Sequence, residues 1–162
     1  MSTFDDERRM QPYMDSFYKL LGYSSIDRSK SCKQFDCIIE KNNKPYKVEE
    51  KYLFCKVYKQ LLVELIQDIK SADMGWFYHV DCDCLVWAYC NEDRTSEPNK
   101  IYIIKWGLFK KYVIENISNV TWTQVNICTK NYGITLNWTI KWDDLMEQDI
   151  ATPYPFDYPI PF

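Results

Sequence analysis

The sequence predicts one α/β domain of mixed α+β type, with a central mixed β-sheet flanked by helices. Three observations lead to this fold class: a helical apolar pattern near the N-terminus, two β-enriched runs around a polar turn at 41–45, and a continuous apolar run at 84–90. The 162 residues suit one domain with a single hydrophobic core. We therefore expect a domain over 1–150 and a proline- and aromatic-rich tail over 151–162.

The first half of the chain is expected to fold as helix, hairpin and helix. Pro12 suits a first helical turn and Gly22 the position after the last turn. Further on, Leu61, Leu65 and Ile69 recur at helical spacing and predict a second helix. In order, the elements are a helix over 11–21, a strand over 34–40, a strand over 46–54 and a helix over 58–73.

The second half alternates further strands and helices. The run at 84–90 has no polar positions and is typical of a buried central strand. The tail has four prolines in its last ten residues, so we expect it to be extended at the surface. The expected elements are a short strand at 75–80, strands at 84–90 and 100–106, a helix at 107–116, a strand pair within 120–140 and a short helix at 141–149.

Charge and composition restrict the kind of protein. No apolar run reaches the ~18 residues that span a bilayer, and the first ten residues lack the apolar core of a signal peptide. Seven cysteines without a CxxC pair indicate free thiols, so we expect a cytoplasmic protein away from membranes. The net charge of −3 argues mildly against a clamp for long duplex DNA, but acids gathered around a cation would also lower it.

The hairpin carries charges where apolar residues are expected. Side chains alternate along a strand, so Glu49 and Lys51 share one face and Glu50 lies on the other. Asp36 lies on the partner strand, where directly opposed Cβ atoms are about 4.5–5.5 Å apart. Two carboxylates that close repel each other unless a cation such as Mg²⁺ lies between them. With a lysine beside them, they form a set suited to metal-assisted phosphodiester hydrolysis.

The spacing of these charges resembles a known nuclease motif. Asp36, followed after twelve residues by Glu49-Glu50-Lys51, is similar to the motif of the PD-(D/E)XK nuclease superfamily, and the likeness to small phage and bacterial single-domain members extends over roughly residues 5–115. The resemblance implies a restriction-endonuclease-like core and a Mg²⁺-dependent endonuclease acting on DNA, with Mn²⁺ able to substitute. Asp36 and Glu49 would hold the metal, and Lys51 would be the catalytic lysine.

Other acids have secondary places in this interpretation. The resemblance makes Glu64, on the following helix, an accessory acid and Asp83 a structural anchor at the start of the buried strand. A β-bulge in this strand would place Glu50, instead of Glu49, on the same face as Asp36. Glu7, from the N-terminal segment, is a further candidate. One hairpin cuts one strand, so cutting both strands of a duplex would need a homodimer; duplex, branched and single-stranded DNA all stay open as substrates.

Two other interpretations stay open. The acidic pI of about 5.2 and the aromatic C-terminal third fit a catalytically inactive protein of the same fold that binds nucleic acid or a protein partner. Trp138 and Trp142 could then belong to a partner surface, whereas Trp76 and the aromatics around 84–106 are expected in the core. A weaker alternative is a zinc site, whose ligands would be His79, Cys82, Cys84 and Cys90.

Overall fold

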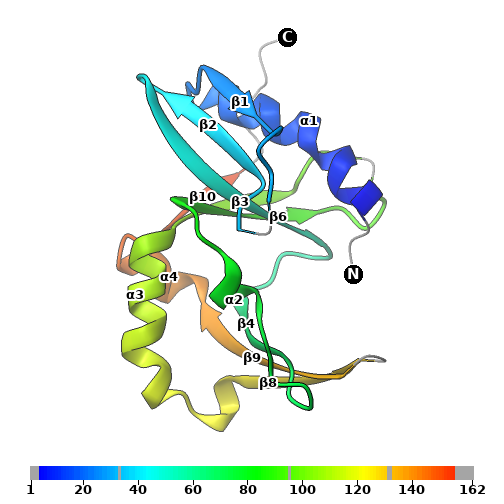
Figure 1. Ribbon diagram of the computed structural model, residues 1–162, viewed down its shortest axis with the longest axis vertical. Coiled ribbons are helices and arrows are strands. Elements are labelled where there is room, and N and C mark those ends of the chain that lie inside the picture. The colour runs from blue at the N-terminus through cyan, green and yellow to red at the C-terminus, as the bar shows by residue number, and fades with distance from the viewer. Residues whose placement is uncertain (1–3, 33, 95, 131–132, 156–162) are drawn as a thin grey trace.

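The computed structural model describes residues 4–32, 34–94, 96–130 and 133–155 and shows a mixed α+β fold with two β-sheets (Figure 1). The helical elements are α1 (Phe4–Leu20), α2 (Trp76–His79), α3 (Trp106–Asn116), α4 (Trp142–Glu147) and the 3-10 turns η1 (Ile117–Asn119) and η2 (Trp122–Gln124). The strands are β1 (Ser25–Asp27), β2 (Cys37–Lys41), β3 (Lys44–Phe54), β4 (Gln60–Asp68), β5 (Asp73–Met74), β6 (Cys84–Cys90), β7 (Lys100–Lys105), β8 (Val125–Lys130), β9 (Gly133–Lys141) and β10 (Ala151–Pro155). Among the described residues, no helix combines the length and apolar character needed to cross a membrane.

The larger sheet is built around the predicted hairpin. Its six strands lie in the order β1-β2-β3-β6-β7-β10, and all neighbours are antiparallel except β3 and β6, which are parallel. The β2–β3 turn contains Asn42 and Asn43 at φ of 54° and 59°, a left-handed conformation that asparagine tolerates well. The hairpin and the buried strand at 84–90 are therefore confirmed.

Strand β6 divides the hydrophobic interior into two cores. Leu85, Trp87 and Tyr89 point to one side, where the second sheet, α2, α3 and α4 pack. The alternate residues of β6 point to the other side, where α1 covers the sheet with side chains that include Met14 and Tyr18. Figure 1 shows α1 and the second sheet on opposite sides of the larger sheet. Any residue of β3 or β6 therefore faces one of two different environments, according to its parity.

The segment predicted as a helix over 58–73 contains strand β4, so that prediction is wrong. Its buried residues Leu61, Val63 and Leu65 alternate with more exposed ones, the period of a strand. Strand β4 pairs with β9, which lies some seventy residues further along the chain, and the second sheet has the order β5-β4-β9-β8. A distant pairing partner thus outweighed the local helical spacing of leucine and isoleucine.

The short strand predicted at 75–80 is also wrong, because residues 76–79 form the one-turn helix α2. Phe77 and Val80, three positions apart, are buried against the second sheet and α3. Gly75 precedes the helix and lies directly on strand β4: a Cβ atom there would be 2.0 Å from the carbonyl oxygen of Glu64. Only glycine allows this close approach of two backbones.

The remaining elements agree with the sequence analysis. The helix predicted at 11–21 is confirmed and begins earlier, at Phe4. The strand at 100–106, the helix at 107–116, the late strand pair and the short helix at 141–149 are also found. Trp138 and Trp142 are buried in the core and not on a partner surface. Residues 151–155 of the expected tail pair with β7 as strand β10, and the rest of the tail lies outside the described residues.

Candidate functional site

The register of the hairpin brings Asp36 and Glu49 together. Cys37 pairs with Val48, so Asp36, one residue before β2, lies opposite Glu49. The Asp36 backbone N–H donates to the Val48 carbonyl at 2.8 Å, which continues the pairing by one step. Cys37 and Val48 are buried in the core under α1. The side chains of Asp36, Glu49 and Lys51 consequently share the opposite face, towards α2 and the second sheet.

Glu49 is buried beside a like charge. Its residue exposure is 6%, and burial together with the Asp36 carboxylate raises the pKa of Glu49 to about 7 against the opposing effect of Lys51. Lys51 forms an ion pair with Glu49, and its Nζ lies 5.8 Å from the centroid of the Trp76 ring. These contacts place two carboxylates and one ammonium group in one cluster on the sheet face.

Asp36 is oriented by the backbone of the neighbouring strand. Its Oδ2 accepts a hydrogen bond from the Glu50 N–H at 2.7 Å. Burial raises the pKa of Asp36, and so do the nearby charges of Glu50 and Glu7, against the opposing effects of the Glu50 N–H and Lys51. The N-terminal helix therefore brings Glu7 close enough to act on Asp36 electrostatically. The pKa values of Asp36 and Glu49 are both raised, as expected for two buried carboxyl groups.

Glu50 has a different role on the opposite face. Its Oε1 accepts hydrogen bonds from the Tyr18 hydroxyl at 2.7 Å, Arg28 at 3.1 Å and the Cys37 thiol at 4.0 Å, and its Oε2 accepts from the Tyr52 hydroxyl at 2.7 Å and Arg28 at 2.9 Å. Arg28 also pairs with Asp15 of α1 at 2.8 Å. The β2–β3 register runs without a bulge. This full set of partners favours a structural role for Glu50 and leaves Glu49 as the acid next to Asp36.

Two further acids named from the sequence have contrasting places. Asp83 accepts a hydrogen bond from the Lys47 N–H at 2.8 Å and donates its own N–H to the Lys47 carbonyl at 2.9 Å, so it anchors β6 to β3 as expected. Glu64 lies on strand β4, not on a helix. Within the described residues, no hydrogen bond or ion pair joins Glu64 to Asp36 or Glu49, and its accessory role stays a prediction.

The Asp36–Glu49 pair has the donor chemistry for a magnesium ion. Mg²⁺ prefers oxygen ligands and commonly uses one or two carboxylates together with water and phosphate oxygens. Burial raises the pKa of both carboxyl groups, and the Asp36 charge adds to the raised pKa of Glu49; a divalent cation would favour the charged form of both. Among the described residues, no group of three or more histidine, cysteine or acidic side chains surrounds a metal-sized space. The described part of the chain thus offers two ligands, Asp36 and Glu49.

The zinc alternative has no support in the described part of the chain. Cys84 and Cys90 lie on strand β6, whereas Cys82 precedes it. Cys84 and Cys90 pack in the core under α1, whereas Cys82 packs against the other core. The exposed His79 ring places its Nε2 3.2 Å from the carbonyl oxygen of Met74. These four side chains do not converge.

Sequence analysis did not identify Arg28 or Trp76 as neighbours of the hairpin acids. Arg28 lies in a stretch that looks like an ordinary polar loop, and its partners at positions 15 and 50 are distant in sequence. Trp76 was expected to fill the core, but it is only partly buried and touches the site through Lys51.

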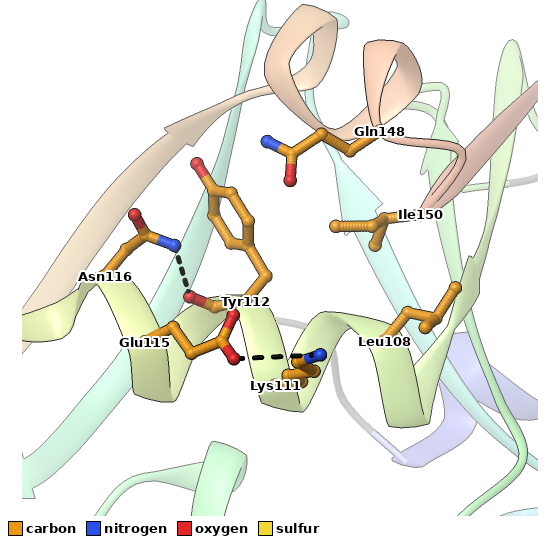
Figure 2. Close-up of a pocket in the computed structure, with 7 residues that line it drawn as sticks. All are labelled: Leu108, Lys111, Tyr112, Glu115, Asn116, Gln148 and Ile150. Carbon is orange, nitrogen blue, oxygen red and sulfur yellow. Dashed lines mark hydrogen bonds and ion pairs between the residues drawn. The ribbon is translucent and has the colours of Figure 1, made fainter.

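A separate cavity of about 200 Å³ lies between α3 and the segment around Gln148 and Ile150 (Figure 2). Some of its polar groups already have partners: Lys111 pairs with Glu115 at 3.8 Å, and the Asn116 side chain donates to the Tyr112 carbonyl at 2.8 Å. None of the hairpin charges lines this cavity.

No protein-family model matches the chain, and no curated protein matches it. The interpretation of the site therefore depends on its own geometry and chemistry.

Proposed function

We propose that the protein is a Mg²⁺-dependent nuclease that hydrolyses phosphodiester bonds of DNA, acting as an endonuclease on a restriction-endonuclease-like core. One observation carries the proposal: Asp36 and Glu49 face each other with raised pKa values, and Lys51 lies on the same face in contact with Glu49. Such clusters of perturbed carboxylates are characteristic of functional sites. The mixed sheet that carries the acids on adjacent strands, with α1 across one face, also fits the proposed core.

Each residue has a defined task in this mechanism. Asp36 and Glu49 would hold the cation with their carboxylate oxygens, and the Glu50 N–H keeps Asp36 in place. Glu49 must lose its proton before it can bind the cation, so its pKa of about 7 makes binding depend on pH near neutrality. The chemistry that Mg²⁺ would supply there is that of a Lewis acid, which would lower the pKa of a water molecule. Lys51 stabilises negative charge that develops on the phosphate or orients the attacking water.

Plasmid and single-stranded DNA should be incubated with the protein and Mg²⁺ or Mn²⁺. We expect cleavage by the wild-type protein and its loss in Lys51→Ala and Asp36→Asn. Lys47→Ala is a matched control because Lys47 lies on the same strand, is exposed, and pairs with Asp81 outside the cluster. Cleavage that persists in both Lys51→Ala and Asp36→Asn would rule out this site.

A catalytically inactive protein on the same fold is the second candidate. It is favoured by the finding that only two carboxylates, and no third ligand among the described residues, form the candidate metal site. Calorimetry separates the two candidates. Mg²⁺ binding that disappears in Glu49→Ala supports the nuclease, whereas a folded protein that binds no Mg²⁺ supports a role in binding nucleic acid or a protein partner.

A further inference from the structure

Lys51 has two contacts that hold its ammonium group in place. The side chain is 30% exposed, and the flexible four-carbon stem of a lysine lets the charge move into water unless something holds it. One contact is the ion pair with Glu49, and the other is the face of Trp76, whose centroid lies 5.8 Å from Nζ. That distance is within the range of about 6 Å for a cation–π interaction, and tryptophan is the strongest aromatic partner.

The Trp76 ring is itself held from three sides. It packs against Trp87 at 6.1 Å and Trp106 at 6.2 Å between ring centroids. The residue before it, Gly75, lies on the backbone of β4 so closely that no side chain fits between them, and its N–H donates to the Leu65 carbonyl at 2.9 Å. Trp87 of β6, Trp106 of α3 and the contact of Gly75 with β4 therefore fix the position of the ring.

The two contacts of Lys51 differ in what happens when Glu49 binds a cation. A carboxylate that shares its charge with a divalent ion attracts a nearby ammonium group less strongly. The aromatic face of Trp76 is unaffected by that change. Trp76 is then the contact that keeps Lys51 beside the reacting phosphate.

We propose that Trp76 is the positioning residue for Lys51: a cation–π contact, supported by the packing of the Trp76 ring on Trp87 and Trp106, holds the ammonium group at the site. The inference rests on the proposed function, and it deepens that function by adding a residue that acts through Lys51 without touching DNA. Trp76 is therefore expected to affect the rate of cleavage and not the binding of substrate.

The contact can be tested without measuring activity. In the metal-free protein, NMR should show the ε-CH₂ protons of Lys51 shifted upfield by the Trp76 ring current. Trp76→Leu should remove that shift, whereas Tyr78→Leu, an exposed position on the same helix, should leave it unchanged. A Lys51 signal that is the same in wild type and Trp76→Leu would overturn the proposal, whether or not the protein cleaves DNA.

Kinetics supply the second readout. We expect Trp76→Leu to lower kcat by about 3- to 30-fold with KM unchanged, and Trp76→Phe to recover part of the loss. Tyr78→Leu should retain wild-type kcat.

An unchanged kcat in Trp76→Leu would overturn the proposal. A raised KM with unchanged kcat would also overturn it, because Trp76 would then contact DNA directly. Wild-type cleavage by Lys51→Ala would instead count against the proposed function, and the NMR result would still decide the contact. If Trp76→Leu does not fold, Trp76→Phe replaces it: because phenylalanine is a weaker cation–π partner, kcat should still fall below the wild-type value.

Discussion

The two faces of strand β3 give two adjacent glutamates different partners. Glu49 and Glu50 are each 6% exposed. Glu50 accepts four hydrogen bonds from one arginine and two tyrosines, whereas Glu49 has one lysine and lies beside the like-charged Asp36. Equal burial therefore says little about role. The difference lies in the groups that surround each carboxylate. A buried carboxylate with a full set of hydrogen-bond donors stabilises the fold, whereas one that lies beside a second carboxylate is suited to binding a cation.

The largest effect is expected on the Glu50 face. Arg28→Ala leaves the buried Glu50 carboxylate without its cation and should lower the free energy of unfolding by about 3–5 kcal/mol. Urea denaturation followed by circular dichroism would measure the change. Lys105→Ala is a suitable control because its ion pair with Asp149 is exposed, and such pairs contribute about 0–1 kcal/mol. Similar stabilities of the two variants would contradict the structural role of the Glu50 network.

Glu49→Gln should affect activity more than stability. Removing this carboxylate should lower kcat/KM by about 10²- to 10³-fold, the loss typical of a residue that stabilises charge in the transition state. Stability should hold or increase, since the like-charge repulsion with Asp36 disappears. Thermal melts beside the kinetic assay would show both effects. The matched variant Glu50→Gln should show the reverse pattern, a larger loss of stability than of activity. Equal losses of stability in Glu49→Gln and Glu50→Gln would contradict the proposed difference between the two faces.

The stability of the metal-free protein should depend on pH through the Glu49 face. The folded-state pKa of Glu49 is raised from 4.5 to about 7, so the folded protein holds a proton that the unfolded chain has lost. The free energy of unfolding should therefore fall as pH rises from about 4.5 to about 7, by at most about 3 kcal/mol. Denaturation at a series of pH values would measure the slope. Glu49→Gln should flatten the dependence of the unfolding free energy on pH in this range. If the dependence in Glu49→Gln is the same as in wild type, Glu49 does not cause it.

The smallest effect is expected from single hydroxyl groups on the Glu50 face. Tyr18→Phe and Tyr52→Phe each remove one 2.7 Å hydrogen bond to the carboxylate and leave both hydrogen bonds from Arg28, so each should cost about 1.5 kcal/mol. The exposed Tyr78→Phe, on helix α2, should have no effect on the unfolding free energy. Losses no larger than that of Tyr78→Phe would show that the tyrosines add little to the network.

Strand parity was sufficient to predict which hairpin charges meet. Alternation along β3 separates Glu49 and Lys51 from Glu50, and a short turn brings Asp36 opposite. These relations extend over fewer than twenty residues, so they are visible locally. The partners of Glu50 are not, because Tyr18 and Arg28 reach it through tertiary folding of a helix and a loop that the local pattern does not connect to the strand.

Strand β4 shows why the second sheet was not predicted. Leucine and glutamate favour helices, and the spacing of Leu61, Leu65 and Ile69 fits one. The structure instead buries Leu61, Val63 and Leu65, and Val63 is the residue that the helical interpretation left without a role. The pairing with β9 decides the outcome, and a partner so far along the chain leaves no signal in a short window.

The prolines of strand β10 have a consequence for assembly. Pro153 and Pro155 have the same parity and pair opposite residues of β7, and because proline has no N–H to donate, the edge of the sheet lacks two of its donors. At the other edge, β1 is only three residues long. Neither edge is a good template for strand addition from a second copy. If two copies join to cut both strands of a duplex, the larger sheet is therefore not expected to continue from one copy into the other.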